Sequence, residues 1–153
     1  MSSQQDSFSE RIYPSVGVSL ALLALDFSIV FAVWAALDLF FAIVIALVVL
    51  SLSLLWWFKA IARIEVRAGT LQVNQARIEI RLLKGVQALT GEPWRRRRGA
   101  DFDPRLFHAH RFWMKSGVEF TLDDPRDPHP AWLVGSKRNQ ELSALVSELI
   151  ARN

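Results

Sequence analysis

Residues 16–58 read VGVSLALLALDFSIVFAVWAALDLFFAIVIALVVLSLSLLWWF, and this stretch decides the fold. It contains only two charged side chains, Asp26 and Asp38. Because the hydrocarbon core of a bilayer is about 30 Å thick, a membrane-spanning helix needs about 20 apolar residues. The stretch is too long for one span and fits two spans joined by a very short turn. A cleaved signal peptide is disfavoured, since no charged segment abuts a short apolar run, and we predict a transmembrane helical hairpin over residues 12–58.

The second span is predicted over residues 39–58, because this segment carries no charge and ends at the membrane-exit pattern Trp56-Trp57-Phe58-Lys59. The first span leaves two registers open, which differ in where they place Asp26. In one register the chain turns at Asp38, and Asp26 lies near the middle of the bilayer at a cost of about 3 kcal/mol.

In the other register the first helix ends near Asp26, and residues 27–37 form an oblique or interfacial segment. Both carboxylates then lie near the outer face of the membrane. This second register is slightly favoured, since nothing else in the sequence supports an ion path through the membrane.

Orientation follows from the basic residues that flank the spans. Arg11 precedes the first span, Lys59, Arg63 and Arg67 follow the second, and the hairpin itself has no Lys or Arg. Positive charge stays on the cytoplasmic side, so both termini are predicted to be cytoplasmic, in a multi-pass protein of the inner or plasma membrane. Residues 1–11, rich in Ser and Gln, are predicted to be a disordered cytoplasmic leader.

The remaining residues, 59–153, have the composition of a basic, water-soluble domain. The chain has 18 Lys and Arg against 15 Asp and Glu, and all but one of these cations follow residue 58. The absence of Cys excludes disulfides, Cys-ligated zinc and iron–sulfur chemistry.

This domain opens with alternating strands. In Arg63-Ile64-Glu65-Val66-Arg67 and Arg77-Ile78-Glu79-Ile80-Arg81 the apolar side chains share one face, as in half-buried strands. Further strands are predicted over residues 71–73, 86–89, 106–114, 118–122 and 132–134, with a loop over 91–99. The chain closes with an amphipathic helix whose N-cap is Ser136. This α+β order predicts a small antiparallel β-sandwich or partly open barrel, pleckstrin-homology-like, capped by the C-terminal helix.

A run of four arginines is the most conspicuous local feature: Trp94 is followed by Arg95, Arg96, Arg97 and Arg98. Basic side chains near an anionic leaflet each contribute about 1 kcal/mol of attraction. We interpret the run as a lipid-facing loop, with Arg63 and Arg67 holding the domain to the headgroups. A solvated cluster that only fixes topology is the alternative, and nucleic acid is disfavoured because no aromatic side chains interleave with the charges.

Three histidines raise the question of a metal site. His108 and His110 share a face of one predicted strand, and His129 could supply a third imidazole, the minimum for zinc. Without an HExxH motif we predict no metal and no cofactor. The sequence also lacks a G-x-S-x-G elbow and a Gly-rich phosphate loop, so no catalytic residues and no enzyme activity are predicted.

From residue 60 onward the chain resembles a family of small actinobacterial membrane proteins known only as a domain of unknown function. The motifs that carry the resemblance are Arg63-x-Glu65-Val66 with Gly69, Arg111-x-Trp113, Val118-Glu119-Phe120, Asp124-Pro125-x-Asp127-Pro128-x-Pro130-x-Trp132-Leu133-Val134, Ser136-Lys137-Arg138 and Glu141-Leu142. The resemblance implies two apolar helices before the soluble domain, and no reaction, substrate or cofactor. The family joins its spans by a Gly/Pro-containing loop, whereas residues 26–38 contain neither residue.

The Asp-Pro string is interpreted as a rigid hairpin turn with Trp132 packed on Arg111 and Trp113. We expect an integral membrane protein that acts as an interaction or scaffold module, its cytoplasmic domain contacting anionic headgroups or a partner protein. The alternative is a transporter accessory or proton-path component that uses Asp26.

Overall fold

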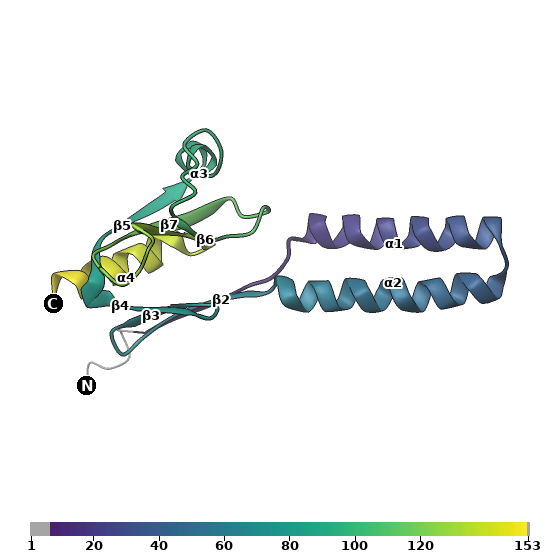
Figure 1. Cartoon of the computed structure of the whole chain (residues 1–153), viewed down its shortest axis with the longest axis horizontal. Helices are drawn as coiled ribbons and strands as arrows, with labels where there is room; N and C mark the ends of the chain where they lie inside the picture. The colour runs from purple at the N-terminus through teal and green to yellow at the C-terminus, as the bar shows by residue number, and fades with distance from the viewer. Residues whose placement is uncertain (1–6, 153) are drawn as a thin grey trace. The chain divides into compact units, whose positions relative to one another are not determined.

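The computed structural model describes residues 7–152, which divide into two compact units (Figure 1). Tyr13–Ile61 form one unit. The other unit contains the residues up to Ile12 together with those from Ala62 onward. The first unit is therefore an insertion into the chain of the second.

The inserted unit is a helical hairpin of α1 (Val16–Ala36) and α2 (Leu39–Ala60), which lie side by side (Figure 1). The turn is at Asp38, whose carboxylate caps α2 by accepting a hydrogen bond from the Phe41 amide at 3.2 Å. This is the first of the two predicted registers, and the favoured second register is wrong. An Asp at the N-cap begins a new helix without Gly or Pro, so residues 27–36 simply continue α1 past Asp26.

Both helices are long and apolar enough to cross a membrane. Their lengths, 21 and 22 residues, correspond to roughly 32 Å at the helical rise. No residue of α1 is buried, and in α2 only Ala42 and Ala60 are. Within the described residues, the large apolar side chains of these helices are therefore mostly exposed and not packed in a core.

A strand precedes the hairpin, which corrects the prediction of a disordered leader. β1 (Phe8–Ile12) pairs antiparallel with β2 (Ala62–Arg67), with Ile12 opposite Ala62. Phe8, Glu10 and Ile12 point inward and are buried, and an inward Glu hid the alternation from the sequence analysis. Residues 1–6 of the predicted leader lie outside the described residues.

The second unit contains two four-stranded sheets. In the first, β1, β2, β3 (Thr70–Val73) and β4 (Ala76–Glu79) follow one another as antiparallel neighbours. The 3₁₀ turn η1 (Ile80–Leu82) then leads to the second sheet, whose order is β5 (Leu83–Thr90), β7 (Ser116–Leu122), β8 (Ala131–Gly135) and β6 (Phe107–Ala109). β6 runs parallel to β8, and the other pairs of this sheet are antiparallel.

One core joins the two sheets to the C-terminal helix α4 (Asn139–Ala151). Leu142 and Val146 of α4 are fully buried, and α4 packs mainly on β5. The predicted α+β class, a two-sheet domain with a C-terminal helix after two apolar helices, is confirmed. The predicted strand over residues 106–114 is shorter, because the chain leaves the sheet after Ala109.

The end of β1 nearest α4 is fastened to the start of that helix. Glu10 accepts hydrogen bonds from the Ser136 hydroxyl at 2.6 Å and from the Lys137 amide at 2.9 Å. The Arg138 guanidinium lies 4.8 Å from the centre of the Phe8 ring. Arg138, not Ser136, is the N-cap of α4, while the Ser136 hydroxyl accepts from the Arg138 amide.

Because Ile12 and Ala62 are paired, the hairpin insert is replaceable by a short turn. We expect a chain in which Asn-Gly replaces residues 13–61 to fold as a monomeric soluble domain, since Asn-Gly supplies the backbone geometry of a tight hairpin. A fragment of residues 59–153 is expected to unfold more readily, because it loses the burial of Phe8 and Ile12, about 1.5–3 kcal/mol each. Urea unfolding followed by circular dichroism measures the difference. Equal stability of the two proteins would contradict the assignment of β1 to this domain.

Candidate functional site

The arginine run is not a loop but a short helix, α3 (Glu92–Arg98). Gly91, at a φ of 64°, precedes it, and Pro93 lies in its first turn, where its missing amide hydrogen is tolerated. Trp94 faces inward with no exposed surface, and its indole nitrogen donates to the Met114 carbonyl at 2.9 Å. Trp94 is therefore a core residue, which corrects its assignment as part of a lipid-facing loop.

Each arginine of α3 has a partner within the domain. Arg95 pairs with Glu92, Arg96 with Asp101 at 3.1 Å, Arg97 with both oxygens of Glu119 at 2.7 and 2.6 Å, and Arg98 donates to the carbonyls of Met114 and Phe112 at 2.8 and 3.1 Å. The hydrogen bonds that Arg97 donates to Glu119 raise the pKa of Arg97. Three carboxylates thus compensate most of the charge of the run. Arg97 fastens α3 to β7, and Arg98 fastens it to the segment that precedes this strand.

The packing under α3 depends on a glycine. The Arg98 guanidinium lies 5.5 Å from the centre of the Trp94 ring, and Gly117 of β7 lies against the opposite part of that ring. A Cβ at position 117 would come within 2.3 Å of the Trp94 side chain and 2.4 Å of the Val134 carbonyl oxygen. Only glycine fits beneath this indole.

We expect Gly117→Ala to destabilise the domain by about 1–3 kcal/mol or more, because neither the indole nor the neighbouring backbone can move freely. Gly85→Ala is the matched control, since a Cβ there meets only the Thr121 hydroxyl at 4.0 Å. The free energy of unfolding from urea titrations tests both. A Gly117→Ala protein as stable as the Gly85→Ala protein would contradict the packing of Trp94.

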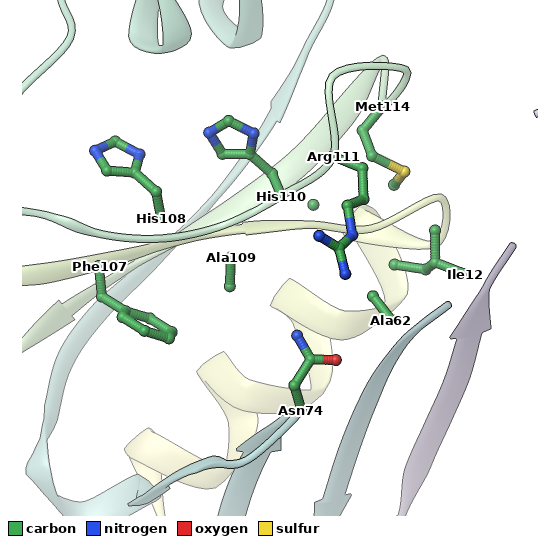
Figure 2. A pocket seen from close by; sticks show the side chains of 10 residues that line it. Ile12, Ala62, Asn74, Phe107, His108, Ala109, His110, Arg111 and Met114 are labelled. Carbon is green, nitrogen blue, oxygen red and sulfur yellow. The ribbon is translucent and has the colours of Figure 1, made fainter. Parts of the chain in front are cut away.

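A cavity of about 110 Å³ lies between β6 and the first sheet (Figure 2). It is lined by Ile12, Ala62, Asn74, Phe107, His108, Ala109, His110, Arg111, Met114 and Gly135. Side chains alternate along residues 107–110. The rings of His108 and His110 point to one side, whereas Phe107 and Ala109 point to the other (Figure 2). The Arg111 guanidinium extends toward the side of Asn74 (Figure 2).

The two histidines are the least satisfied polar groups of the domain. Their ring centroids are 5.6 Å apart, and the planes are nearly perpendicular. His108 Nε2 lies 2.9 Å from the Asp103 carbonyl oxygen, but His108 Nδ1 and both ring nitrogens of His110 are buried without a hydrogen-bond partner in the described structure. Burial, then the charge of Arg98 and the neighbouring His108, lower the pKa of His110 to about 4, so its ring is neutral at pH 7.

The third histidine lies in a different place. His129 Nδ1 is 2.8 Å from an oxygen of Asp127, and its ring contacts Phe107. The three imidazoles considered from the sequence therefore do not meet. Among residues 7–152, no group of three or more His, Cys, Asp or Glu side chains is arranged to hold a metal ion.

The Asp-Pro string forms a turn fixed by its own carboxylates. Asp124 accepts from the Arg126 amide at 2.9 Å, and Asp127 accepts from the His129 amide at 2.9 Å and from the Trp132 indole at 3.0 Å. Burial opposes ionisation of Asp127, but these hydrogen bonds outweigh it and lower its pKa.

The aromatic side chains near this turn contact two phenylalanines. The Trp132 ring packs on Phe107, with 4.9 Å between centroids, and the Trp113 ring lies 4.8 Å from Phe112. The packing of Trp132 on Arg111 and Trp113 stays a prediction. Pro130 completes the turn by accepting a backbone hydrogen bond from Leu122 at 3.0 Å.

The outer face of the first sheet carries the basic residues predicted to meet the membrane, and one more. Arg63 and Arg67 are exposed on β2, and Arg11 is exposed on β1 directly opposite Arg63. Only the pair Ile12 and Ala62 separates these two arginines from the helical insert. This pair was not predicted from the sequence, because Arg11 fell within the predicted disordered leader.

Within the helical unit, Asp26 lies midway along α1. The Ser53 hydroxyl donates to one of its oxygens at 2.9 Å, and the other oxygen is buried and has no partner in the part of the chain that the structure describes. Two turns away, the Trp57 indole donates to the Ser19 hydroxyl at 3.4 Å. These side chains line one groove of the hairpin, together with Leu22, Leu23, Leu50 and Leu54.

Comparison with known proteins identifies a family but no characterised relative. No curated protein matches the chain, and no solved structure matches it. A family model matches residues 7–146, which span β1, both apolar helices and the domain as far as the middle of α4. This confirms the resemblance to a domain of unknown function, and the chain belongs to the family described as "Protein of unknown function (DUF3093)".

Proposed function

We propose that this protein is a two-span integral membrane protein and that its domain is an interaction module for anionic lipid headgroups. The observation that carries the proposal is the pair of exposed arginines, Arg11 and Arg63, facing each other where the chain leaves the sheet for the apolar helices.

Membrane insertion is supported by the helices and by the strands that flank them. Large apolar side chains cover both helices and are exposed. Paired strand residues such as Ile12 and Ala62 have Cα atoms about 4.5–5.5 Å apart, so the chain enters and leaves the bilayer on the same side. The cations Arg11, Lys59 and Arg63 beside the two ends then favour cytoplasmic termini in the plasma membrane.

The arginine pair needs a compensating anion. Like charges directly opposite each other on antiparallel strands destabilise a sheet. Within residues 7–152 neither guanidinium forms a hydrogen bond or an ion pair. Glu10, which precedes Arg11 on β1, faces the buried side of the sheet and binds Ser136 and Lys137. A phosphate placed between Arg11 and Arg63 would remove the repulsion and accept hydrogen bonds from both planar guanidinium groups.

The other basic residues are expected to contribute less to headgroup binding. Arg67 lies at the far end of β2 and faces Thr70. Arg95 and Arg96 are exposed on α3, but Glu92 and Asp101 compensate their charges. We therefore rank Arg11 and Arg63 above Arg67, and Arg67 above the arginines of α3.

The ranking predicts which arginines set lipid selectivity. For the full chain in phosphatidylcholine vesicles, we expect spin-labelled phosphatidylglycerol to associate more strongly than spin-labelled phosphatidylcholine. The ratio should fall about fivefold for each of Arg11→Gln and Arg63→Gln, since each cation contributes about 1 kcal/mol near an anionic surface. Added salt should weaken the selectivity of the wild type. Electron paramagnetic resonance of the labelled lipids measures the ratio.

Arg95→Gln/Arg96→Gln is the matched control, because it removes the same charge from α3. It should change the ratio less than Arg11→Gln/Arg63→Gln does. An equal fall of the ratio in the two double variants would mean that lipid selectivity depends on net charge alone, and would contradict a specific role of Arg11 and Arg63. No selectivity in the wild type would redirect the search to a protein partner.

Asp26 favours a second candidate function, a proton-path or transporter-accessory role. A carboxylate oxygen without a partner in an apolar helix is energetically costly and is by default a candidate functional group. Ser19, Ser53 and Trp57 extend polar contacts from Asp26 toward the end of the hairpin that joins the domain.

If this role holds, vesicles containing the wild type should take up protons faster than protein-free vesicles under an imposed potential. Asp26→Asn keeps the Ser53 hydrogen bond and should return uptake to the protein-free rate. Asp38→Asn, which preserves the helix cap, is the control and should leave uptake unchanged. A lumenal pH dye reports the rates, and equal uptake in all vesicles would exclude the role.

A further inference from the structure

The histidine pair of β6 is not explained by lipid binding. Among the described residues, His108 Nδ1 and both ring nitrogens of His110 are buried and have no hydrogen-bond partner. An unsatisfied buried polar group costs about 1–3 kcal/mol, and each of the two rings has at least one such nitrogen. Neither ring satisfies the other, because no hydrogen bond joins them.

The surroundings of His108 determine which of its two ring nitrogens carries the proton. Its Nε2 faces the Asp103 carbonyl at 2.9 Å, and a carbonyl only accepts hydrogen bonds, so Nε2 carries the proton. The lone pair is then on Nδ1, the nitrogen that has no partner. A ring N–H that donates to a backbone carbonyl is the usual support of a metal-binding histidine.

The two rings lie at a distance that one ion can bridge. Imidazole nitrogens bind first-row metals at about 2.0–2.1 Å, so two rings on one ion have centroids roughly 5–6 Å apart. The observed separation is 5.6 Å. Figure 2 shows the rings side by side on the same side of β6, with a nitrogen of each directed toward the other ring.

Both rings are held in place by neighbours. The Phe102 ring stacks on His108 with 4.6 Å between centroids, and His110 meets the edge of Trp94 at 5.5 Å. On the adjacent strand β8, a Cβ at Gly135 would lie only 3.1 Å from the Cβ of His110. A pair of ligands fixed in this way loses little conformational freedom on binding.

We propose that His108 and His110 chelate one divalent transition-metal ion, with water completing its coordination. The donors are imidazole nitrogens, and the charged side chain that acts on His110 is the cation Arg98. Such a site selects against Mg²⁺ and Ca²⁺, which require oxygen ligands, and suits Cu²⁺, Ni²⁺ and Zn²⁺.

The test uses the full chain in detergent micelles, without an affinity tag, titrated with Cu²⁺. We expect one Cu²⁺ per chain, and an electron paramagnetic resonance spectrum split by two imidazole nitrogens. His108→Gln and His110→Gln should each weaken binding by at least about tenfold and remove one nitrogen from the spectrum. His129→Gln is the control and should change neither, because His129 lies with Asp127.

Near-ultraviolet circular dichroism of each variant checks that the environment of Trp94 is retained. If His110→Gln fails this check, His108→Gln alone decides, since the ring of His108 stacks on Phe102 and not on Trp94. Less than one Cu²⁺ per chain in the wild type, a spectrum without two nitrogens, or wild-type affinity in His108→Gln would overturn the proposal.

Discussion

The pairing of β1 with β2 is the contact on which the rest of the structure depends. It brings together two segments separated by the whole helical hairpin, with Ile12 opposite Ala62. The same pairing buries Phe8 and places Glu10 against the start of α4, so one short strand closes the first sheet and fastens the C-terminal helix. Without β1, the β2 edge of the sheet would be open and the core would lose part of its cover.

The most conspicuous basic run of the sequence is not the same as the basic pair that strand pairing brings together on the surface of the domain. The four consecutive arginines of α3 are the obvious basic feature of the sequence, yet carboxylates and carbonyls of the domain engage all of them. Arg11 and Arg63 are far apart in the sequence, and strand pairing makes them neighbours, for which residues 7–152 supply no ion-pair partner. The exposed electrostatic feature is therefore produced by tertiary structure, which places uncompensated charge beside the apolar helices in the chain.

Sequence patterns with a strong local period predicted their elements well. The apolar run gave both helices, alternation gave β2 to β4, and the apolar stripe of residues 142–150 gave α4. β1 was not predicted, because its inward-facing Glu10 breaks the apolar alternation and its partner strand β2 is distant in the sequence. α3 was predicted as a loop, because Gly, Pro and four arginines are typical of one. In the structure, buried Trp94 and the Arg97–Glu119 ion pair stabilise a helix there. His108 and His110 were correctly placed on one face. The burial of their ring nitrogens could not be predicted, because it depends on tertiary contacts.

The insertion of the hairpin has a consequence for the order of folding. β1 leaves the ribosome before either apolar helix, but its partner β2 follows only after both have been made. The pairing has a high sequence separation, so it must form late, and the sheet cannot close until the hairpin has reached its environment. Until then Phe8 and Ile12 have no apolar surface to cover. Under the proposed membrane placement, folding of the domain depends on successful insertion of the helices, and a chain whose hairpin did not insert would expose an incomplete sheet to proteolysis.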